Sequence, residues 1–499
     1  MSHRFLAGWG ETDLTPEKKV RLAGQFAERI SDSVETPVQA ISLALESDTG
    51  AAVFCGCDLE SVGLNLLALV REKLAALAPD LDPRCVIISA THSHTSVQYT
   101  NRNIEGRGSL SILRRYLPDS IRYKDSLPAD DSVMSDDEAL PWLADCISRS
   151  IAQAWANRAP ATVSNQFGRA AVGMCRRATY NDGTAQMWGD TNTSNFVALE
   201  GGSDTGVEML YVFDESGNLT GVAANLACPA QTVQHRTFLS SDFWGKTRIL
   251  VREALGENVK VLGLCSPAGD QCPVDLIRWV EPESDVHDPN IKRCDPPARK
   301  ADPSMFDVAG SWKAGRRVAR EIIDAYEDAV RERAVPEVFC HEVLDVKLPV
   351  RFVTMRERDD AEEQIRRYVD RAGGRAFSFE DNAKMHVYAG ILARYELQQN
   401  LLQFPTEIHV LRLENMAFAT SPFELFLDYA NWIRAQSPAE QTFLIQLANG
   451  SLGYLPTAKA EAGGHYSAYV SSGITGHEGG DLLVRRTLTE IRRQFGKSC

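Results

Sequence analysis

The segment Cys85–His94 restricts the fold more than any other part of the chain. It joins an apolar run, Val86 to Ile88, to two histidines, His92 and His94, at positions i and i+2. A short β-branched run of this kind predicts a buried strand. In layered α/β proteins, ligands bind just beyond the carboxyl ends of such strands. In extended backbone both imidazoles would point to the same side, so the segment predicts a site that uses both as metal ligands or acid–base groups.

Strands and helices alternate around these histidines. Strands are predicted at 40–45 and 51–57, followed by a helix with one apolar stripe at 62–77. This order predicts the α/β class, with a parallel or mixed sheet covered by helices. Further strands are predicted at 209–213, 219–226, 259–265, 407–413, 416–420 and 443–447, and further helices at 140–156, 243–254, 309–330 and 481–493, with another opening at 423.

Three segments interrupt the alternation. Residues 101–138 are irregular, and residues 281–307 are rich in proline, aspartate and basic side chains. A long irregular loop is either a functional lid or a solvated excursion. Residues 355–402 are charged and predict a surface hairpin of helices. The length of 499 residues allows one large α/β domain or two to three smaller ones, and these three segments are candidate insertions.

Composition and charge limit the partners. The net charge of -14 argues against nucleic acid or an anionic membrane surface as the main partner. We expect no membrane span, because no apolar stretch reaches ~18 residues. The first residues show no secretion signal, and the 11 cysteines show no disulfide spacing. These features predict a cytoplasmic protein that acts on a small-molecule substrate, and they leave a homo-oligomer open.

Further polar side chains follow other predicted strands. Asp270 and Cys272 follow one strand, His235 another, and Tyr454 a third, while Glu424 is predicted in the first turn of a helix. Each has an ordinary structural explanation, such as a helix cap, a buried thiol or a surface histidine. Together, imidazoles and one carboxylate suit a zinc ion with an open coordination position. Such an ion activates water and polarises a carbonyl at neutral pH.

Six motifs follow one another in an order that is typical of one family: Ala7–Pro16, Asp58–Leu59, Ala90–His94, Ser241–Gly245, Ala268–Pro273 and Pro422–Glu424. Through them the chain resembles the neutral/alkaline non-lysosomal ceramidase superfamily over essentially its whole length. The resemblance implies a single catalytic domain over residues 1–499, with insertions at about 101–138, 281–307 and 355–402. Members of that family are zinc amidohydrolases that cleave the N-acyl amide of ceramide. They have a large α/β catalytic domain, often followed by a small β-sandwich domain, which we expect this chain to lack.

The resemblance implies a role for each matching residue. His92 resembles the first zinc ligand, Glu424 the carboxylate ligand, and Tyr454 the tyrosine ligand. His94 resembles the histidine that hydrogen-bonds the tetrahedral intermediate, and Asp270 the acidic residue of the Gly-Asp loop.

The chain departs from the family pattern at three places. The second zinc histidine follows a Phe-Ala run in ceramidases, where this chain has Leu226–Pro229, and His235 is the nearest replacement. Cys272 stands where ceramidases have a serine. The Arg-Ser-Pro-like run of the family corresponds to Arg176–Ala178, where Arg177 is the candidate for substrate contact.

These observations predict a zinc-dependent hydrolase that cleaves a C–N bond, with Zn²⁺ held by His92, His235, Glu424 and Tyr454. His94 and the metal are expected to stabilise the oxyanion.

The glycine-rich loop at 464–480 is expected to close one wall of the pocket. Two alternatives stay open: a metal-free hydrolase with Cys272 as nucleophile, and a binding protein without turnover. Ceramide itself fits poorly, and a small soluble amide or ester fits better.

Overall fold

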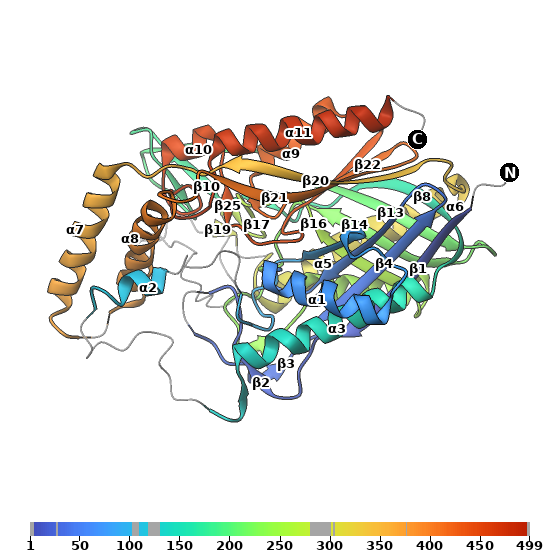
Figure 1. The fold of residues 1–499 in the computed structure, drawn as a ribbon, viewed down its shortest axis with the longest axis horizontal. Helices are drawn as coiled ribbons and strands as arrows, with labels where there is room; N and C mark the ends of the chain where they lie inside the picture. The colour runs from blue at the N-terminus through green and yellow to red at the C-terminus, as the bar shows by residue number, and fades with distance from the viewer. Residues whose placement is uncertain are drawn as a thin grey trace.

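Two β-sheets face each other in this protein, and helices cover both outer sides (Figure 1). The computed structural model describes residues 4–25, 28–101, 109–117, 130–279, 301–302, 305–375 and 377–496. The predicted α/β class, with mixed sheets covered by helices, is confirmed.

The larger sheet has eight strands. In spatial order they are β16 (Lys260–Cys265), β14 (Leu219–Leu226), β13 (Gly206–Asp214), β8 (Ala159–Arg169), β1 (Phe5–Asp13), β4 (Gln39–Ser47), β5 (Ala51–Cys57) and β6 (Val86–Ala90). The pairs β5–β6 and β14–β16 are parallel and the other pairs are antiparallel. Helix α1 (Leu64–Leu77) connects β5 to β6, as the alternation predicts.

The smaller sheet has four strands: β20 (Phe339–Pro349), β21 (Gln403–Leu413), β22 (Met416–Thr420) and β24 (Gln441–Ile445). Its side chains alternate in direction. Leu411, Phe418 and Phe443 face the larger sheet, and the rings of Phe418 and Phe443 stack with centroids 4.4 Å apart. Val410 and Leu444 face the helices on the opposite side. The contact between the sheets is therefore an apolar core that fixes their relative position.

Helices cover the outer faces in three groups. Helices α1 and α3 (Asp136–Ala156) pack on β1, β4, β5 and β6. Helices α4 (Asp242–Leu255), α5 (Asp307–Asp324) and α6 (Tyr326–Glu332) pack on β13, β14 and β16. Helices α9 (Leu427–Gln436) and α11 (His477–Phe495) pack on the smaller sheet. None of the helices in the described ranges has both the length and the apolar character to cross a membrane.

A helical hairpin extends from one end of the sandwich (Figure 1). It consists of α7 (Met355–Ala372) and α8 (Phe379–Leu397), and it packs with α2 (Ser109–Leu113) around its own small apolar cluster. This hairpin occupies the segment 355–402 for which helices are predicted. Most of the predicted insertion at 281–307, and part of that at 101–138, lie outside the described residues.

Two predicted helices differ from the structure. The helix predicted at 309–330 is divided into α5 and α6 at Ala325. The helix predicted to open at 423 begins only at Leu427, because Glu424–Leu425 forms a short strand, β23, that pairs with β25 (Tyr454–Leu455).

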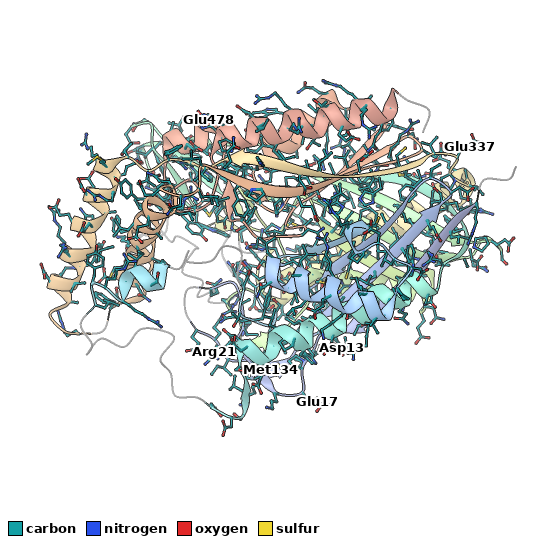
Figure 2. The ribbon with its side chains drawn as sticks, in the orientation of Figure 1. Asp13, Glu17, Arg21, Met134, Glu337 and Glu478 are labelled. Atoms are coloured by element: carbon teal, nitrogen blue, oxygen red, sulfur yellow. The ribbon has the colours of Figure 1, made fainter. Side chains whose placement is uncertain are left out.

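The remaining elements are short. They are β2 (Lys19–Val20), β3 (Ser33–Val34), β7 (Val133–Met134), β9 (Met174–Cys175), β10 (Arg177–Tyr180), β11 (Ala185–Met187), β12 (Phe196–Leu199), β15 (Phe238–Leu239), β17 (Gln271–Cys272), β18 (Asp275–Trp279), β19 (Ala301–Asp302), α10 (Ala458–Gly463) and the 3-10 turn Pro83–Cys85. Figure 2 shows Arg21 and Met134 close together, where β2 pairs with β7.

Candidate active site

The chain turns sharply after β6, at the two histidines. His92 has a φ of 62°, so the backbone is not extended there, contrary to the prediction. The turn is held because the N–H of Thr91 donates to the carbonyl of Cys57, at 2.9 Å. The two imidazoles nevertheless meet, with their Nε2 atoms 3.2 Å apart. The expectation that both rings serve one place therefore agrees with the geometry.

A buried ion pair supports this turn from behind. Arg248 of α4 donates to Oδ1 of Asp58 at 3.0 Å, and the Thr91 hydroxyl donates to the same oxygen at 3.3 Å. Both ionic side chains are almost fully buried. Breaking a buried ion pair is costly, so this contact fixes the turn that carries the histidines.

A carboxylate and a phenol join His92 from the other side. Oε2 of Glu424 lies 3.3 Å from Nε2 of His92. Residues Glu424 and Tyr454 are register partners in the parallel pair β23–β25, and their side chains share a hydrogen bond. On the far side of its ring, Nδ1 of His92 lies 2.7 Å from the carbonyl of Glu60. This carbonyl accepts a hydrogen bond from the Nδ1–H and so orients Nε2 toward Glu424.

The pKa values in this cluster are shifted by burial and by neighbouring charges. Burial lowers the pKa of His92, but Glu424 and Glu60 together outweigh burial and the net pKa is raised. Burial raises the pKa of Glu424, but His92 and Arg176 outweigh it and the net pKa is lowered. Burial, together with His92, lowers the pKa of His94 well below its usual value. Burial raises the pKa of Tyr454 well above its usual value. At neutral pH the site therefore holds an ionised Glu424 and a neutral His94.

Arg176 contributes a positive charge to the site. Its side chain is 3% exposed, and its guanidinium donates to the carbonyl of Gly269 at 3.0 Å and to the Tyr454 hydroxyl at 3.4 Å. It also donates to Oε1 of Gln231 at 3.3 Å, which orients that amide so that its nitrogen faces Nε2 of His94 at 2.8 Å. A guanidinium and an amide thus link the tyrosine to the second histidine.

The neighbouring Arg177 points away from this cluster. The sequence favours Arg177 for substrate contact, but the structure places Arg176 in the site. Arg177 forms a buried ion pair with Glu200, with Nε and Oε2 2.5 Å apart. It also donates to the carbonyls of Gly464 and Tyr466 at 2.9 and 3.0 Å. Arg177 therefore holds the glycine-rich loop in place instead of facing the histidines.

His235 lies outside the cluster. Its Nε2 is 3.6 Å from a carboxylate oxygen of Asp307, and its ring stacks on Phe306 with centroids 5.1 Å apart. Within the described residues, no contact joins His235 to His92 or Glu424. The chain between β14 and His235 does not bring this ring back to the site, and the side chain that reaches it from this segment is Gln231. The structure thus gives no support to His235 as the replacement for the second zinc histidine.

Asp270 and Cys272 have structural contacts. Asp270 accepts the N–H of Leu427 at the start of α9, at 2.9 Å, and burial raises its pKa to about 6. The Cys272 thiol donates to the carbonyl of Val274 at 3.2 Å, and burial raises its pKa to about 12. A thiol that stays protonated at neutral pH is a poor nucleophile, so this environment does not favour the metal-free alternative.

The cluster contains donor atoms of the kinds that a zinc ion needs. Among the described residues, no three His, Cys, Asp or Glu side chains form a metal-binding group. A set that includes a phenol does converge: Nε2 of His92, Oε2 of Glu424 and the hydroxyl of Tyr454. An imidazole nitrogen and a carboxylate oxygen are common zinc donors, and a carbonyl that orients the imidazole is the usual second contact of such a ligand. These residues therefore fit a zinc ion without His235.

A cavity of about 290 Å³ adjoins the cluster. Gly24 lines it and packs directly on His94, since a Cβ at Gly24 would lie 2.3 Å from Cγ of that imidazole. Tyr466 also lines it and meets Tyr454 edge to face, with ring centroids 5.4 Å apart. The lining residues are Ala23, Gly24, Gln25, Glu60, Ser61, Val97, Gln98, Tyr99, Asn101 and Tyr466. The glycine-rich loop thus forms one wall beside Tyr454, as the sequence predicts.

Four residues of the site were missed by the sequence argument. The family pattern favours Arg177 over its neighbour Arg176, and the sequence indicates Tyr466 only as part of the glycine-rich loop. Glu60 follows the Asp58–Leu59 motif directly, and that position could have indicated it. Gln231 gives no signal, because an amide in a loop is an ordinary surface residue.

Comparisons with known proteins give a consistent result. No family model and no curated protein matches the sequence. The structure is similar to that of the neutral ceramidase from Pseudomonas aeruginosa, with a TM-score of 0.67 and 15% identity, covering 100% of this chain and 76% of that one. It is also similar to a ceramidase in complex with C2, with a TM-score of 0.65 and 13% identity, covering 99% of this chain and 76% of that one. The chain therefore has the fold of the neutral ceramidases along its whole length.

Proposed function

We propose that this protein is a zinc-dependent hydrolase that cleaves the C–N bond of a small soluble amide. The observation that supports it best is the convergence of His92, His94, Glu424 and Tyr454 at the carboxyl end of β6. The ionised Glu424 and the neutral His94 are oriented by buried partners and lie next to a cavity. Such an arrangement is typical of an active site.

The chain's own residues account for substrate positioning and charge stabilisation. Nε2 of His94 faces the same space as Nε2 of His92, and Gln231 holds its ring. The charged Arg176 beside the Tyr454 hydroxyl keeps a positive potential where an oxyanion would develop. Gly24 and Tyr466 line the cavity next to these groups.

His92, Glu424 and Tyr454 are the residues that would hold zinc. When bound, zinc supplies a Lewis acid that polarises the carbonyl and activates water at neutral pH. The carbonyl of Glu60 keeps Nε2 of His92 directed toward the other two donors.

The experiment that tests this proposal is an assay of amine release from a panel of small N-acyl amides and matched esters. We expect amide hydrolysis by the wild-type protein, loss on chelation, and recovery on addition of zinc. His92→Ala and Glu424→Gln should each lower kcat/KM by at least about 1000-fold, because each removes one of only three donors.

His477→Ala is the matched control, since His477 lies at the start of α11 and pairs with Glu461. Hydrolysis that survives both chelation and His92→Ala would exclude zinc. Ligand binding without turnover by any amide or ester would instead support a binding protein.

A further inference from the structure

A carboxylate belongs to the described lining of the cavity beside the active site. Among the described lining residues, Glu60 is the one with an acidic or basic side chain, and the others are apolar, amide, hydroxyl or phenol groups. The lining also contains many polar groups, whereas a lipid tail would need apolar walls. A ligand that fits this cavity is therefore small, polar and not anionic.

The carboxylate of Glu60 is fixed but not neutralised. The Ser61 hydroxyl donates to its Oε2 at 2.6 Å, and Asn101 donates to the Ser61 hydroxyl at 3.0 Å. No lysine or arginine in the described residues forms an ion pair with Glu60. The hydroxyl orients the carboxylate directly, and the amide orients the hydroxyl. Because both donors are neutral, they do not cancel the charge of the carboxylate, which keeps its attraction for a cation.

A basic side chain at the cavity wall is directed toward backbone carbonyls. Arg29 donates to the carbonyls of Ala23 and His94, each at 2.6 Å, and to the carbonyl of Gln234 at 2.7 Å. It therefore holds the wall of the cavity against the histidine turn by backbone contacts. Its guanidinium does not pair with Glu60.

The position of Glu60 connects the cavity to the reacting groups. Its backbone carbonyl contacts Nδ1 of His92 at 2.7 Å, while its side chain lines the cavity. A group bound at the Glu60 carboxylate is thus separated from the His92 imidazole only by the Glu60 residue itself. A second group of the same small molecule can reach the active site.

We propose that Glu60 recognises a substrate ammonium group, and that the substrate is an acyl amide of a small diamine. This inference rests on the proposed function and names its substrate class. The free amine of the diamine binds as ammonium to Glu60, and the acylated nitrogen lies at the cluster of His92, Glu424 and Tyr454. A neutral or anionic group at the same position loses this charge-assisted hydrogen bond.

The test compares three substrates of equal length: monoacetylated diaminopropane, acetamidopropanol and acetamidopropanoate. For wild-type protein we expect kcat/KM to be about tenfold or more higher for the ammonium substrate than for the alcohol, and lowest for the carboxylate. In Glu60→Gln the ratio of ammonium to alcohol substrate should fall to about one, mainly through KM. Gln retains the hydrogen bond from Ser61 and the backbone carbonyl that orients His92.

Glu72→Gln, an exposed position on α1, is the matched control and should keep the wild-type ratio. A wild-type preference for the alcohol or the carboxylate, or a ratio unchanged in Glu60→Gln, overturns the inference and leaves the proposed hydrolase intact. If no amide is hydrolysed at all, the proposed function fails. Calorimetry with monoacetylated diaminopropane then decides the inference: binding that is lost in Glu60→Gln supports it, and absence of binding overturns it.

Discussion

Arg176 and Arg177 are adjacent in sequence and have different tasks in the structure. Arg176 faces the Tyr454 hydroxyl, while Arg177 is buried against Glu200 and the loop that carries Tyr466. Which of two neighbouring arginines faces a site depends on where β10 begins. Sequence alone does not fix that register.

We predict that Arg177→Met lowers the free energy of unfolding by about 3–5 kcal/mol, because it leaves the buried Glu200 carboxylate without a partner. Urea unfolding followed by circular dichroism measures this change. The double variant Arg177→Met/Glu200→Gln should recover part of the loss. A single-variant effect below about 1 kcal/mol would show that the pair is not the anchor of the loop.

Arg176→Met should instead act mainly on catalysis. We predict a fall in kcat of about 100-fold on the preferred amide, because the positive charge beside Tyr454 is lost. The thermal midpoint is measured alongside, and Arg177→Met provides the comparison. Unchanged kcat in a folded Arg176→Met protein would remove this side chain from the proposed charge stabilisation.

Much of the site could be predicted from single residues. The Thr-His-Ser-His segment indicated His92 and His94, and the motif positions indicated Glu424 and Tyr454. His235 was chosen for its place in the sequence, but its ring is held by Asp307 and Phe306. The contact of Gln231 with His94 depends on three-dimensional packing that no local pattern encodes.

Short elements were the hardest to predict. The two-residue strands β23 and β25 bring Glu424 and Tyr454 into register, yet they are too short to show a period of two. The Ser-Pro sequence before Glu424 was taken as a helix start, whereas α9 begins three residues after Glu424, at Leu427. By contrast, β4, β5, α1 and β6 were predictable because their apolar patterns are long.

The strand that carries the histidines is stabilised on its outer edge by one side chain. Oδ1 of Asn449 accepts the N–H of Ile88 at 2.8 Å, and its Nδ2 donates to the carbonyl of Val86 at 2.9 Å. We predict that Asn449→Ala lowers the free energy of unfolding by about 2 kcal/mol, because two buried backbone groups lose their partners. In the same variant, hydrogen exchange at the backbone amide of Ile88 should become faster. Unaltered exchange at that amide would show that the edge of β6 does not need Asn449.

The arrangement of the two sheets was outside the reach of sequence patterns. The polar alternation of β20 and the pairing of β1 with β4 and β8 depend on contacts between distant segments. Sequence showed which segments are apolar, but not which sheet each one joins or that the two sheets face each other.

A half-buried and a buried histidine, His341 and His409, join the sheets and predict a pH dependence. Nδ1 of His341 lies 2.8 Å from the carbonyl of Ala51, and its Nε2 lies 2.9 Å from Nδ1 of His409. Burial, together with His409, lowers the pKa of His341 from 6.5 to about 4. The unfolded chain therefore binds a proton at a higher pH than the native protein does, and stability falls as the pH drops from 6.5 toward 4.

We predict that wild-type protein loses about 3 kcal/mol more than His341→Gln between neutral pH and pH ~4. The difference between the two proteins is the quantity to measure, by urea unfolding at each pH. Burial raises the pKa of Asp242 and of Asp270 to about 6, which gives a slope of the opposite sign in both proteins and cancels in the difference. Parallel pH profiles would contradict the assignment to His341.

The central claim is that His92, Glu424 and Tyr454 together hold a zinc ion that the hydrolase needs. The most direct test is the metal content of purified protein, measured by mass spectrometry after dialysis against zinc-containing and then metal-free buffer. We predict about one zinc per chain in the wild-type protein and in His477→Ala, and less than about a tenth of that in Glu424→Gln. Wild-type protein that retains no zinc yet releases amine from an acyl amide at full rate would contradict the claim.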